Sequence, residues 1–294
     1  MKKPQYLQDW LETPCDIPLS TNPSHYIFRL LKENHECRND KVIDELKNII
    51  QKAHEDAKRK LRRVAEFSLD PLETKMKDPT IGYPEMLDIV TLQGYFGEIF
   101  AGVIAENYDH FGENSWEVPA YPFRFHNVAF STLENWRQTG KLPKRIPGRT
   151  GDDMLAFLKN KEGKITRALV CEAKCTRNHD SRLISDVHKK ASSANPKPVD
   201  LMNLIEILRD YEDEDSKNWE NALRELYHRN VNENYERVDL VAYICGKSPV
   251  RNLSHISPEK PHDQYTAKRK LEAVEVHLKE IKELVQTIYD VPSK

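Results

Sequence analysis

Residues 151–175 read GDDMLAFLKNKEGKITRALVCEAKC, and this stretch decides the fold that we expect. Two apolar runs flank a polar segment that contains a glycine, and this pattern predicts a β-hairpin. An acidic pair, Asp152 and Asp153, opens the first strand, and Glu172 and Lys174 lie near the end of the second. The hairpin therefore brings acidic and basic side chains to one end of a sheet.

The register of the hairpin decides which acid faces Glu172. Side chains alternate along a strand, so Glu172 and Lys174 share a face. A loop of two or four residues places Asp153 opposite Val170, on that same face and diagonal to Glu172, roughly 7 Å away between backbones. A three-residue loop selects Asp152 instead, because a one-residue slip turns every side chain over. We favour Asp153 and keep Asp152 as the alternative.

Two carboxylates and a lysine on one strand face suit the hydrolysis of phosphate esters. Carboxylate oxygens bind Mg²⁺ or Mn²⁺ together with waters and a substrate phosphate. Such a metal polarises a phosphoryl oxygen and activates a bound water, while Lys174 orients that water or neutralises developing charge. The alternative is an exposed strand face with ordinary charges. The apolar run 168–171 favours catalysis, because it predicts a buried strand where an unpaired Glu172 or Lys174 is costly.

Composition limits the class of protein. The 294 residues are 31% charged with a formal net charge of -2, which excludes a globally basic nucleic-acid binder but leaves local basic patches open. The sequence has neither the roughly 18 apolar residues of a membrane span nor an apolar signal segment at its start. The five cysteines are scattered and odd in number, which predicts reduced thiols in a cytoplasmic protein. No second pair joins Cys171 and Cys175 to complete a zinc site.

Taken as a whole, the chain predicts an α/β fold: a central mixed β-sheet flanked by helices, with an N-terminal helical addition. Residues 1–85 are expected to be mainly helical. Residues 86–250 are expected to form the core that holds the hairpin. Residues 251–294 are expected to form a loop and an amphipathic helix that packs on the core or on a partner.

Individual elements follow from the spacing of apolar residues. Apolar positions recur every three or four residues over 39–67, which predicts a long amphipathic helix. The segment 26–31 suits either a strand or a short helix. The apolar run 239–245 predicts a buried strand. Residues 267–289 have the alternating spacing of a heptad repeat, which predicts a final helix. This helix packs on the core, or it docks a partner or a second copy and makes the protein a homo-oligomer.

A helix that begins at about Met86 or Thr91 and ends at Asn107 carries Glu98. Glu98 shares one helix face with small residues, which allow a helix to lie close against a sheet. We therefore expect Glu98 to lie near the sheet and to line the metal site as a third acid. A solvent-exposed Glu98 is the alternative.

Basic residues surround the hairpin in the sequence. Lys144, Arg145 and Arg149 crowd into a segment rich in proline and glycine just before it, and Lys189 and Lys190 lie on the helix expected after it. The first group could follow a nucleic-acid backbone beside the acids, and the second could face the site. A solubilising loop and a solvated helix face are the alternatives.

Three separated elements agree in order with a known superfamily. The helix with Glu98, the hairpin with Asp153, and the Glu172-x-Lys174 strand followed by a helix resemble the PD-(D/E)XK nucleases. Within this superfamily the chain resembles the HamA family, the nuclease subunits of the Hachiman anti-phage defence system. The resemblance covers roughly residues 90–246. A Gly-Asp pair stands where the superfamily has Pro-Asp, so the choice between the two aspartates stays open.

The resemblance implies a restriction-endonuclease-like core and a Mg²⁺-dependent DNase that a partner helicase, HamB, holds in check. Asp153 and Glu172 would bind the metal, with Asp152 as the alternative ligand. Lys174 would assist the attacking water, and Glu98 would complete the acidic cluster. A stand-alone restriction endonuclease is the second candidate, although no dedicated recognition module is evident. A catalytically inactive nucleic-acid-binding or scaffold protein is the third.

Overall fold

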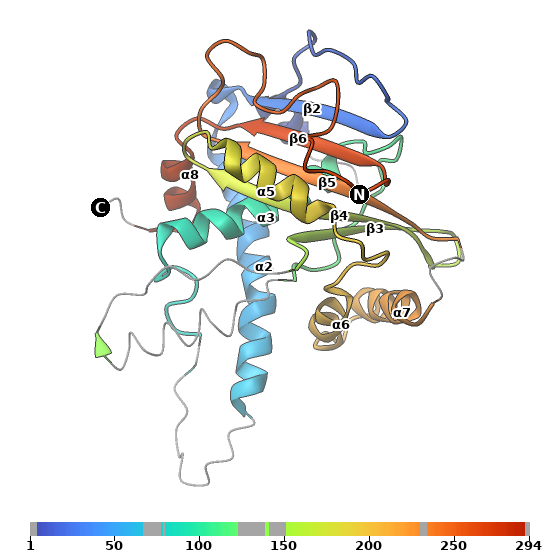
Figure 1. Ribbon diagram of the computed structural model, residues 1–294. Coiled ribbons are helices and arrows are strands. Elements are labelled where there is room, and N and C mark those ends of the chain that lie inside the picture. Colours follow the sequence, from blue (N-terminus) through green and yellow to red (C-terminus); the bar gives the residue numbers. More distant parts are fainter. Residues whose placement is uncertain are drawn as a thin grey trace.

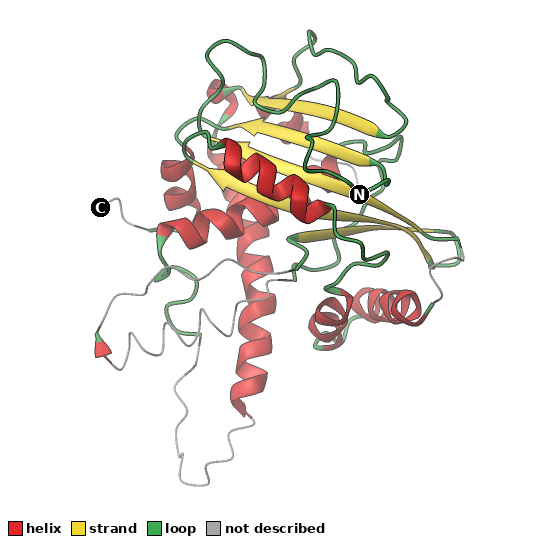
Figure 2. Cartoon of the chain, viewed as in Figure 1, coloured by secondary structure: helices red, strands yellow, loops and turns green. Residues whose placement is uncertain are grey.

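The computed structural model describes residues 5–66, 78, 80–122, 139–140, 151–229 and 234–291 of the chain. Within them, six strands form one mixed sheet in the order β1-β2-β6-β5-β4-β3 (Figure 1). Helices cover both faces of the sheet, so the fold is α/β, as predicted (Figure 2). The strands are β1 Leu11–Glu12, β2 Tyr26–Glu33, β3 Met154–Lys159, β4 Ile165–Thr176, β5 Glu236–Cys245 and β6 Leu271–His277. The helices are α1 Gln5–Trp10, η1 His35–Cys37, α2 Asp40–Glu66, α3 Ile89–Asn107, α5 Ser181–Ala191, α6 Leu201–Arg209, α7 Glu214–His228 and α8 Ile281–Ile288.

The middle of the sheet is parallel. β2, β6, β5 and β4 run in one direction, and β1 and β3 pair antiparallel at the two edges. The register aligns Lys174 with Tyr243 and Tyr243 with Glu275, so these residues form one row across three strands and point to one face. The carboxyl ends of parallel strands lie along one edge, which is where open α/β sheets usually bind ligands.

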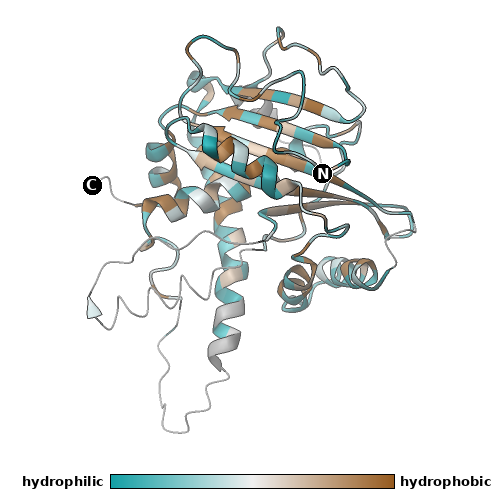
Figure 3. Ribbon diagram, in the orientation of Figure 1, coloured by the Kyte–Doolittle hydropathy of each residue, from teal (hydrophilic) through white to brown (hydrophobic). Residues whose placement is uncertain are grey.

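The two faces of the sheet are covered by different helices (Figure 1). On one face, Cys171 and Ala173 pack in a core that includes Phe96 of α3 and residues of α2 and α8. On the other face, α6 and α7 cover Val170, and α5 covers Tyr243. Figure 3 shows mainly hydrophobic residues along the middle strands. Glu172 and Lys174 alternate with Cys171 and Ala173 and therefore belong to the face that α5 covers.

The predicted helix over 267–289 is wrong in its first half. Residues 271–277 form β6, in the middle of the sheet between β2 and β5, and only α8 is helical. Every residue of β6 is buried. Glu272, Glu275 and His277 made the segment look amphipathic, but each is buried within an ion pair. The heptad spacing came from a strand that is apolar on both faces and interrupted by buried ion pairs.

The N-terminal residues are not a separate helical addition. β2 pairs in parallel with β6, with Tyr26 opposite Leu271, so the open choice at 26–31 is resolved as a strand of the same sheet. α2 confirms the predicted long helix and packs its apolar positions, such as Leu46 and Ile50, into the core of the first face. The expected boundaries at 85 and 250 therefore do not divide the sheet into separate units.

The other predicted elements that position the site are confirmed. α3 begins after Asp88, whose side chain accepts hydrogen bonds from the backbone N–H groups of Val90 and Thr91 and caps the helix. α5 follows β4 as expected, and β5 contains the whole predicted strand. No helix in the described ranges is both long and apolar enough to cross a membrane.

Candidate active site

The hairpin forms as predicted, but its register differs. β3 and β4 pair antiparallel with Met154 opposite Cys171. The predicted pairing of Asp153 with Val170 would place Met154 opposite Leu169, so the observed register lies two residues further along β4. An even shift leaves the alternation of faces unchanged. The side of the sheet predicted for Asp153 is therefore kept, although its predicted diagonal position is not.

The turn explains the change of register. Residues 160–164 join the strands, and a β-bulge follows Leu158. The Asn160 side chain accepts hydrogen bonds from the backbone N–H groups of Glu162 and Lys164. Gly163 adopts a φ of 79°, a left-handed conformation that favours glycine. A loop longer than predicted and the bulge together set the pairing.

Asp153 closes the hairpin ladder directly before β3. Its backbone N–H donates to the Cys171 carbonyl at 3.0 Å, and its Oδ2 accepts from the Ala173 N–H at 2.8 Å. The Nζ of Lys174 lies 3.7 Å from the same Oδ2 atom. Asp153 is only 3% exposed, so this ion pair is largely shielded from water. The structure thus brings Asp153 and Lys174 together, as predicted.

The Asp152 side chain contacts the backbone at the start of α6. Its Oδ2 accepts from the backbone N–H groups of Val199 at 2.6 Å and Asp200 at 3.0 Å. Its own N–H donates to Oδ2 of Asp200 at 2.9 Å. These bonds fasten the start of α6 to the beginning of β3. Asp153, rather than Asp152, is the aspartate beside Lys174.

Glu172 forms an ion pair with a second lysine. The Nζ of Lys190, on the last turn of α5, lies 3.7 Å from Oε2 of Glu172. Asp180 caps α5 by accepting a hydrogen bond from the Arg182 N–H, and this fixes where the helix begins above the sheet. Lys190 thus lies beside Glu172, and its contact with nucleic acid stays a prediction. Lys189 is exposed, and its contact with nucleic acid stays a prediction.

The acid–lysine cluster of Asp153, Glu172, Lys174 and Lys190 thus contains two carboxylate–ammonium pairs. Its oxygen donors also include the Ala173 carbonyl, which accepts from the Lys174 Nζ at 3.0 Å. Carboxylate and carbonyl oxygens are the donors that Mg²⁺ and Mn²⁺ prefer. The residues therefore fit a hard divalent cation, which Asp153 and Glu172 would hold together with waters.

The carboxylates of this cluster affect the pKa of a neighbouring thiol. Burial raises the pKa of the Cys171 thiol well above its ordinary value, and the charges of Asp153 and Glu172 raise it further. Burial likewise raises the pKa of the Cys175 thiol. Both thiols stay protonated at neutral pH and are poor metal ligands or nucleophiles, because the thiolate is the reactive form. The chemistry of the cluster therefore rests on oxygen and ammonium groups.

Glu98 is buried on α3, but this helix packs against the opposite face of β4. α3 approaches the strand closely at Gly97, where a Cβ atom would lie 2.7 Å from the Cβ of Cys175. Glu98 also lies among buried tyrosines, and it adds to the effect of burial in raising the pKa of Tyr83. Glu98 also lies near Cys171 of β4, because its charge, like those of Asp153 and Glu172, helps to raise the pKa of that thiol. Its role as a third acid stays a prediction.

Lys144, Arg145 and Arg149 lie outside the described residues, so their contacts with nucleic acid stay predictions. Arg149 precedes the described Gly151 by two positions in the sequence, and Asp153 follows Gly151 by two. The basic segment therefore leads directly into the acid–lysine cluster along the chain.

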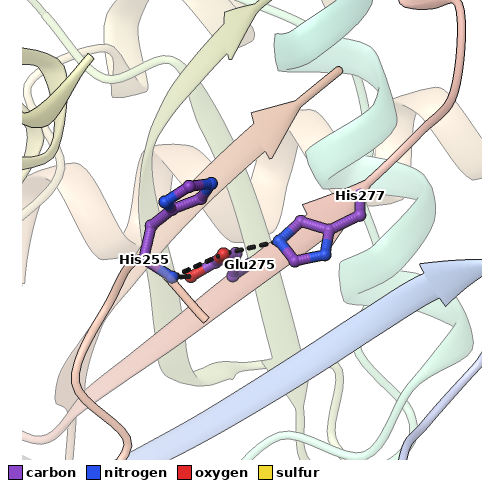
Figure 4. A group of neighbouring side chains, drawn as sticks. All are labelled: His255, Glu275 and His277. Carbon is purple, nitrogen blue, oxygen red and sulfur yellow. Dashed lines mark hydrogen bonds and ion pairs between the residues drawn. The ribbon is translucent and has the colours of Figure 1, made fainter. Parts of the chain in front are cut away.

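A second polar cluster lies on the same face and has no counterpart among the sequence-based predictions. It consists of His255, Glu275 and His277, which we call the histidine cluster (Figure 4). Within the described part of the chain, it is the only group of three or more His, Cys, Asp or Glu side chains close enough to hold one metal ion. The spacing of Glu275-x-His277 suits one face of a strand, but the surrounding sequence suggested a helix.

Comparisons with known proteins do not assign the chain to a family. No protein-family model matches the chain, and no curated protein matches it. The function is therefore inferred from the geometry of the acid–lysine cluster and from the resemblance of its motifs.

Proposed function

We propose that the protein is a metal-dependent nuclease that hydrolyses phosphodiester bonds at the acid–lysine cluster. The observation that carries this proposal is the Lys174 ammonium, 3.7 Å from Oδ2 of the buried Asp153. Glu172 lies two residues earlier on the same face of β4. A lysine beside two buried carboxylates combines a cation site with a positive group for phosphate.

Each residue of the cluster has a role in this proposal. Asp153 and Glu172 would hold the divalent ion, which would supply a Lewis acid for a phosphoryl oxygen and lower the pKa of a bound water. Lys174 orients the attacking water or stabilises charge that develops on the phosphate. Lys190 is 39% exposed at its side chain and can turn from Glu172 towards an incoming phosphate. Both lysines thus exchange a carboxylate partner for the substrate.

The substrate and the setting follow from the resemblance to the HamA family. We propose DNA as the substrate, anti-phage defence as the role, and a HamB-like helicase as the partner that restrains cleavage. A restriction-endonuclease-like core, a cytoplasmic location and the DNA contacts of Lys144, Arg145, Arg149, Lys189 and Lys190 belong to the same proposal. A stand-alone restriction-type endonuclease is the second candidate. Stable co-purification with a helicase would favour the defence assignment over it.

The test is DNA cleavage by the isolated chain with Mg²⁺ or Mn²⁺, on single-stranded, linear and supercoiled DNA. Asp153→Asn, Glu172→Gln and Lys174→Met should each reduce the cleavage rate at least 10²-fold, because each removes a metal ligand or the phosphate-stabilising charge. Asp186→Asn is the matched control, since Asp186 is an exposed residue of α5. Circular dichroism would confirm that every variant is folded.

Two results would contradict the assignment. Wild-type cleavage that persists in Asp153→Asn and Lys174→Met would place the chemistry elsewhere. An absence of cleavage on every DNA form, together with tight DNA binding, would favour a catalytically inactive nucleic-acid-binding or scaffold protein.

A further inference from the structure

The histidine cluster places three good metal donors together at the carboxyl end of the parallel sheet. One ring nitrogen each from His255 and His277 and one carboxylate oxygen of Glu275 lie within 4.8 Å of one another. Glu275 and His277 occupy alternate positions of β6 and therefore share a face. His255 reaches the same point from the loop that follows β5 (Figure 4).

Backbone groups hold the Glu275 carboxylate in place. The N–H of His255 donates to both of its oxygens, at 2.8 and 2.9 Å, and the N–H of Ile256 donates to Oε2 at 2.8 Å. Glu275 is fully buried, so these bonds compensate part of the cost of removing its charge from water. A carboxylate that neighbouring groups hold in place by hydrogen bonds is typical of a metal ligand.

The hydrogen bond of the His255 ring decides which of its nitrogens keeps a lone pair for a metal. Its Nε2 lies 2.9 Å from the Lys247 carbonyl, which can only accept, so Nε2 carries the proton and Nδ1 keeps the lone pair. Metal-bound histidines usually donate their second N–H to such an acceptor. The ring of His179 stacks on His255 with centroids 3.8 Å apart and planes 4° apart, which fixes the ring orientation. His179 is in turn held by the hydroxyl of Tyr243, at 3.2 Å.

One bond must open for an ion to enter. Nε2 of His277 lies 2.6 Å from Oε1 of Glu275, which is a hydrogen-bond distance. Two ligands of a tetrahedral Zn²⁺ stand roughly 3.3 Å apart, given metal–ligand distances of about 2.0 to 2.1 Å. The separation therefore has to grow by about 0.7 Å, and the shared proton leaves as the metal binds.

We propose that His255, Glu275 and His277 form a binding site for a divalent transition-metal ion of the Zn²⁺ class. Two imidazoles and one carboxylate favour Zn²⁺ and its neighbours over Mg²⁺, which prefers oxygen donors alone. Three protein ligands leave the remaining positions of the ion to water or to a substrate atom. The site is separate from the acid–lysine cluster, because Glu275 and Lys174 lie two strands apart in one row. It does not depend on the proposed nuclease activity.

The test is metal binding by the full chain after treatment with a chelator. Zn²⁺ is titrated by calorimetry, and Co²⁺ by its visible absorption, both with millimolar Mg²⁺ present to occupy oxygen-donor sites. The wild type should bind one ion per chain and should melt at a higher temperature with Zn²⁺. Glu275→Gln and His255→Ala should each weaken Zn²⁺ binding at least tenfold and reduce the thermal shift. His228→Ala is the matched control, because His228 is an exposed histidine at the end of α7.

His255→Ala is the decisive variant, because His255 lies on a partly exposed loop and its backbone bonds to Glu275 can persist. Wild-type Zn²⁺ affinity in a folded His255→Ala protein would overturn the proposal. It would also be overturned if Asp153→Asn, rather than His255→Ala, removed the Co²⁺ absorption, because the ion would then lie at the acid–lysine cluster. A wild-type chain that binds no Zn²⁺ stoichiometrically would overturn it as well.

Discussion

The acid–lysine cluster and the histidine cluster lie on one face of one sheet, but they compensate buried carboxylates differently. Asp153 and Glu172 face the ammonium groups of Lys174 and Lys190, whose side chains remain 22% and 39% exposed. Glu275 faces backbone N–H groups and a buried histidine. Long lysine side chains can move aside with little disturbance, whereas a strand and a loop backbone cannot.

In the two proposals above, this difference separates two kinds of cation site. A carboxylate whose partner is a mobile lysine can exchange that partner for a metal and a phosphate during turnover. A carboxylate held by the backbone beside two imidazoles is arranged for one ion that stays. The partner of a buried acid therefore indicates the use of that acid as much as the acid itself does.

The largest expected effect separates the two clusters by activity. Lys174→Met should lower DNA cleavage about 10³-fold, because it removes the charge beside the reacting phosphate. His255→Ala should leave the cleavage rate within about threefold of wild type. Initial rates with Mg²⁺ at saturating DNA measure both. An equal loss in the two variants would merge the clusters into one functional site.

The next effect separates the neighbouring aspartates. Asp152→Ala leaves the backbone N–H groups of Val199 and Asp200 without their acceptor. We expect a loss of about 2 kcal/mol in the free energy of unfolding, measured by urea denaturation. The cleavage rate of the folded variant should stay within twofold of wild type. Asp186→Ala, an exposed control, should change neither quantity. A stable but inactive Asp152→Ala protein would make Asp152 the metal ligand.

A third effect concerns the stability of the fold that carries both clusters, which should fall at acidic pH. Burial, helped by the nearby charge of Lys58, lowers the pKa of His54 from 6.5 to about 3. The unfolded chain therefore binds this proton more readily, and the stability present above pH 6.5 is lost as the pH falls towards 3. At pH 5.5 this group should cost about 1.4 kcal/mol. His54→Gln should flatten the dependence of the unfolding free energy on pH between 7 and 5. An unchanged slope would show that other groups set it.

The smallest effect concerns the exposed half of the acid–lysine cluster. Lys190→Met should raise the KM for DNA about threefold and leave kcat within twofold, because a partly exposed ion pair is screened by water. Lys189→Met is the neighbouring comparison and should raise the KM less. A large fall in kcat for Lys190→Met would instead give Lys190 a role in the chemical step.

The sequence predicted the hairpin and the shared face of Glu172 and Lys174 because the relevant signal is local. Alternation places Glu172 and Lys174 on one face, and an even register shift does not disturb this. The structure adds the contacts of Asp152 with the start of α6, which depend on residues almost fifty positions away. Spacing alone could not separate Asp152 from Asp153, because both precede the same strand.

The histidine cluster and β6 could not be predicted, because they depend on contacts between distant parts of the chain. Glu272, Glu275 and His277 read as the solvated face of a helix, since charged residues are seldom fully buried. Their partners, Arg29, His110 and the His255 backbone, come from distant parts of the chain. Without those partners, the heptad spacing of the apolar residues favoured a helix. Buried charge of this kind is visible only once the sheet is assembled.

The place of β6 in the sheet also has a consequence for how the protein is made. β2 emerges from the ribosome long before β6, its parallel neighbour, with whose Leu271 Tyr26 pairs. Until β6 is synthesised, β2 and β5 both present unpaired, apolar edges, which invite pairing with other chains. The sheet is therefore joined only when β6, the last of its described strands along the chain, has been synthesised. A nascent chain that stops after β5 contains the whole acid–lysine cluster but lacks the strand that joins its sheet.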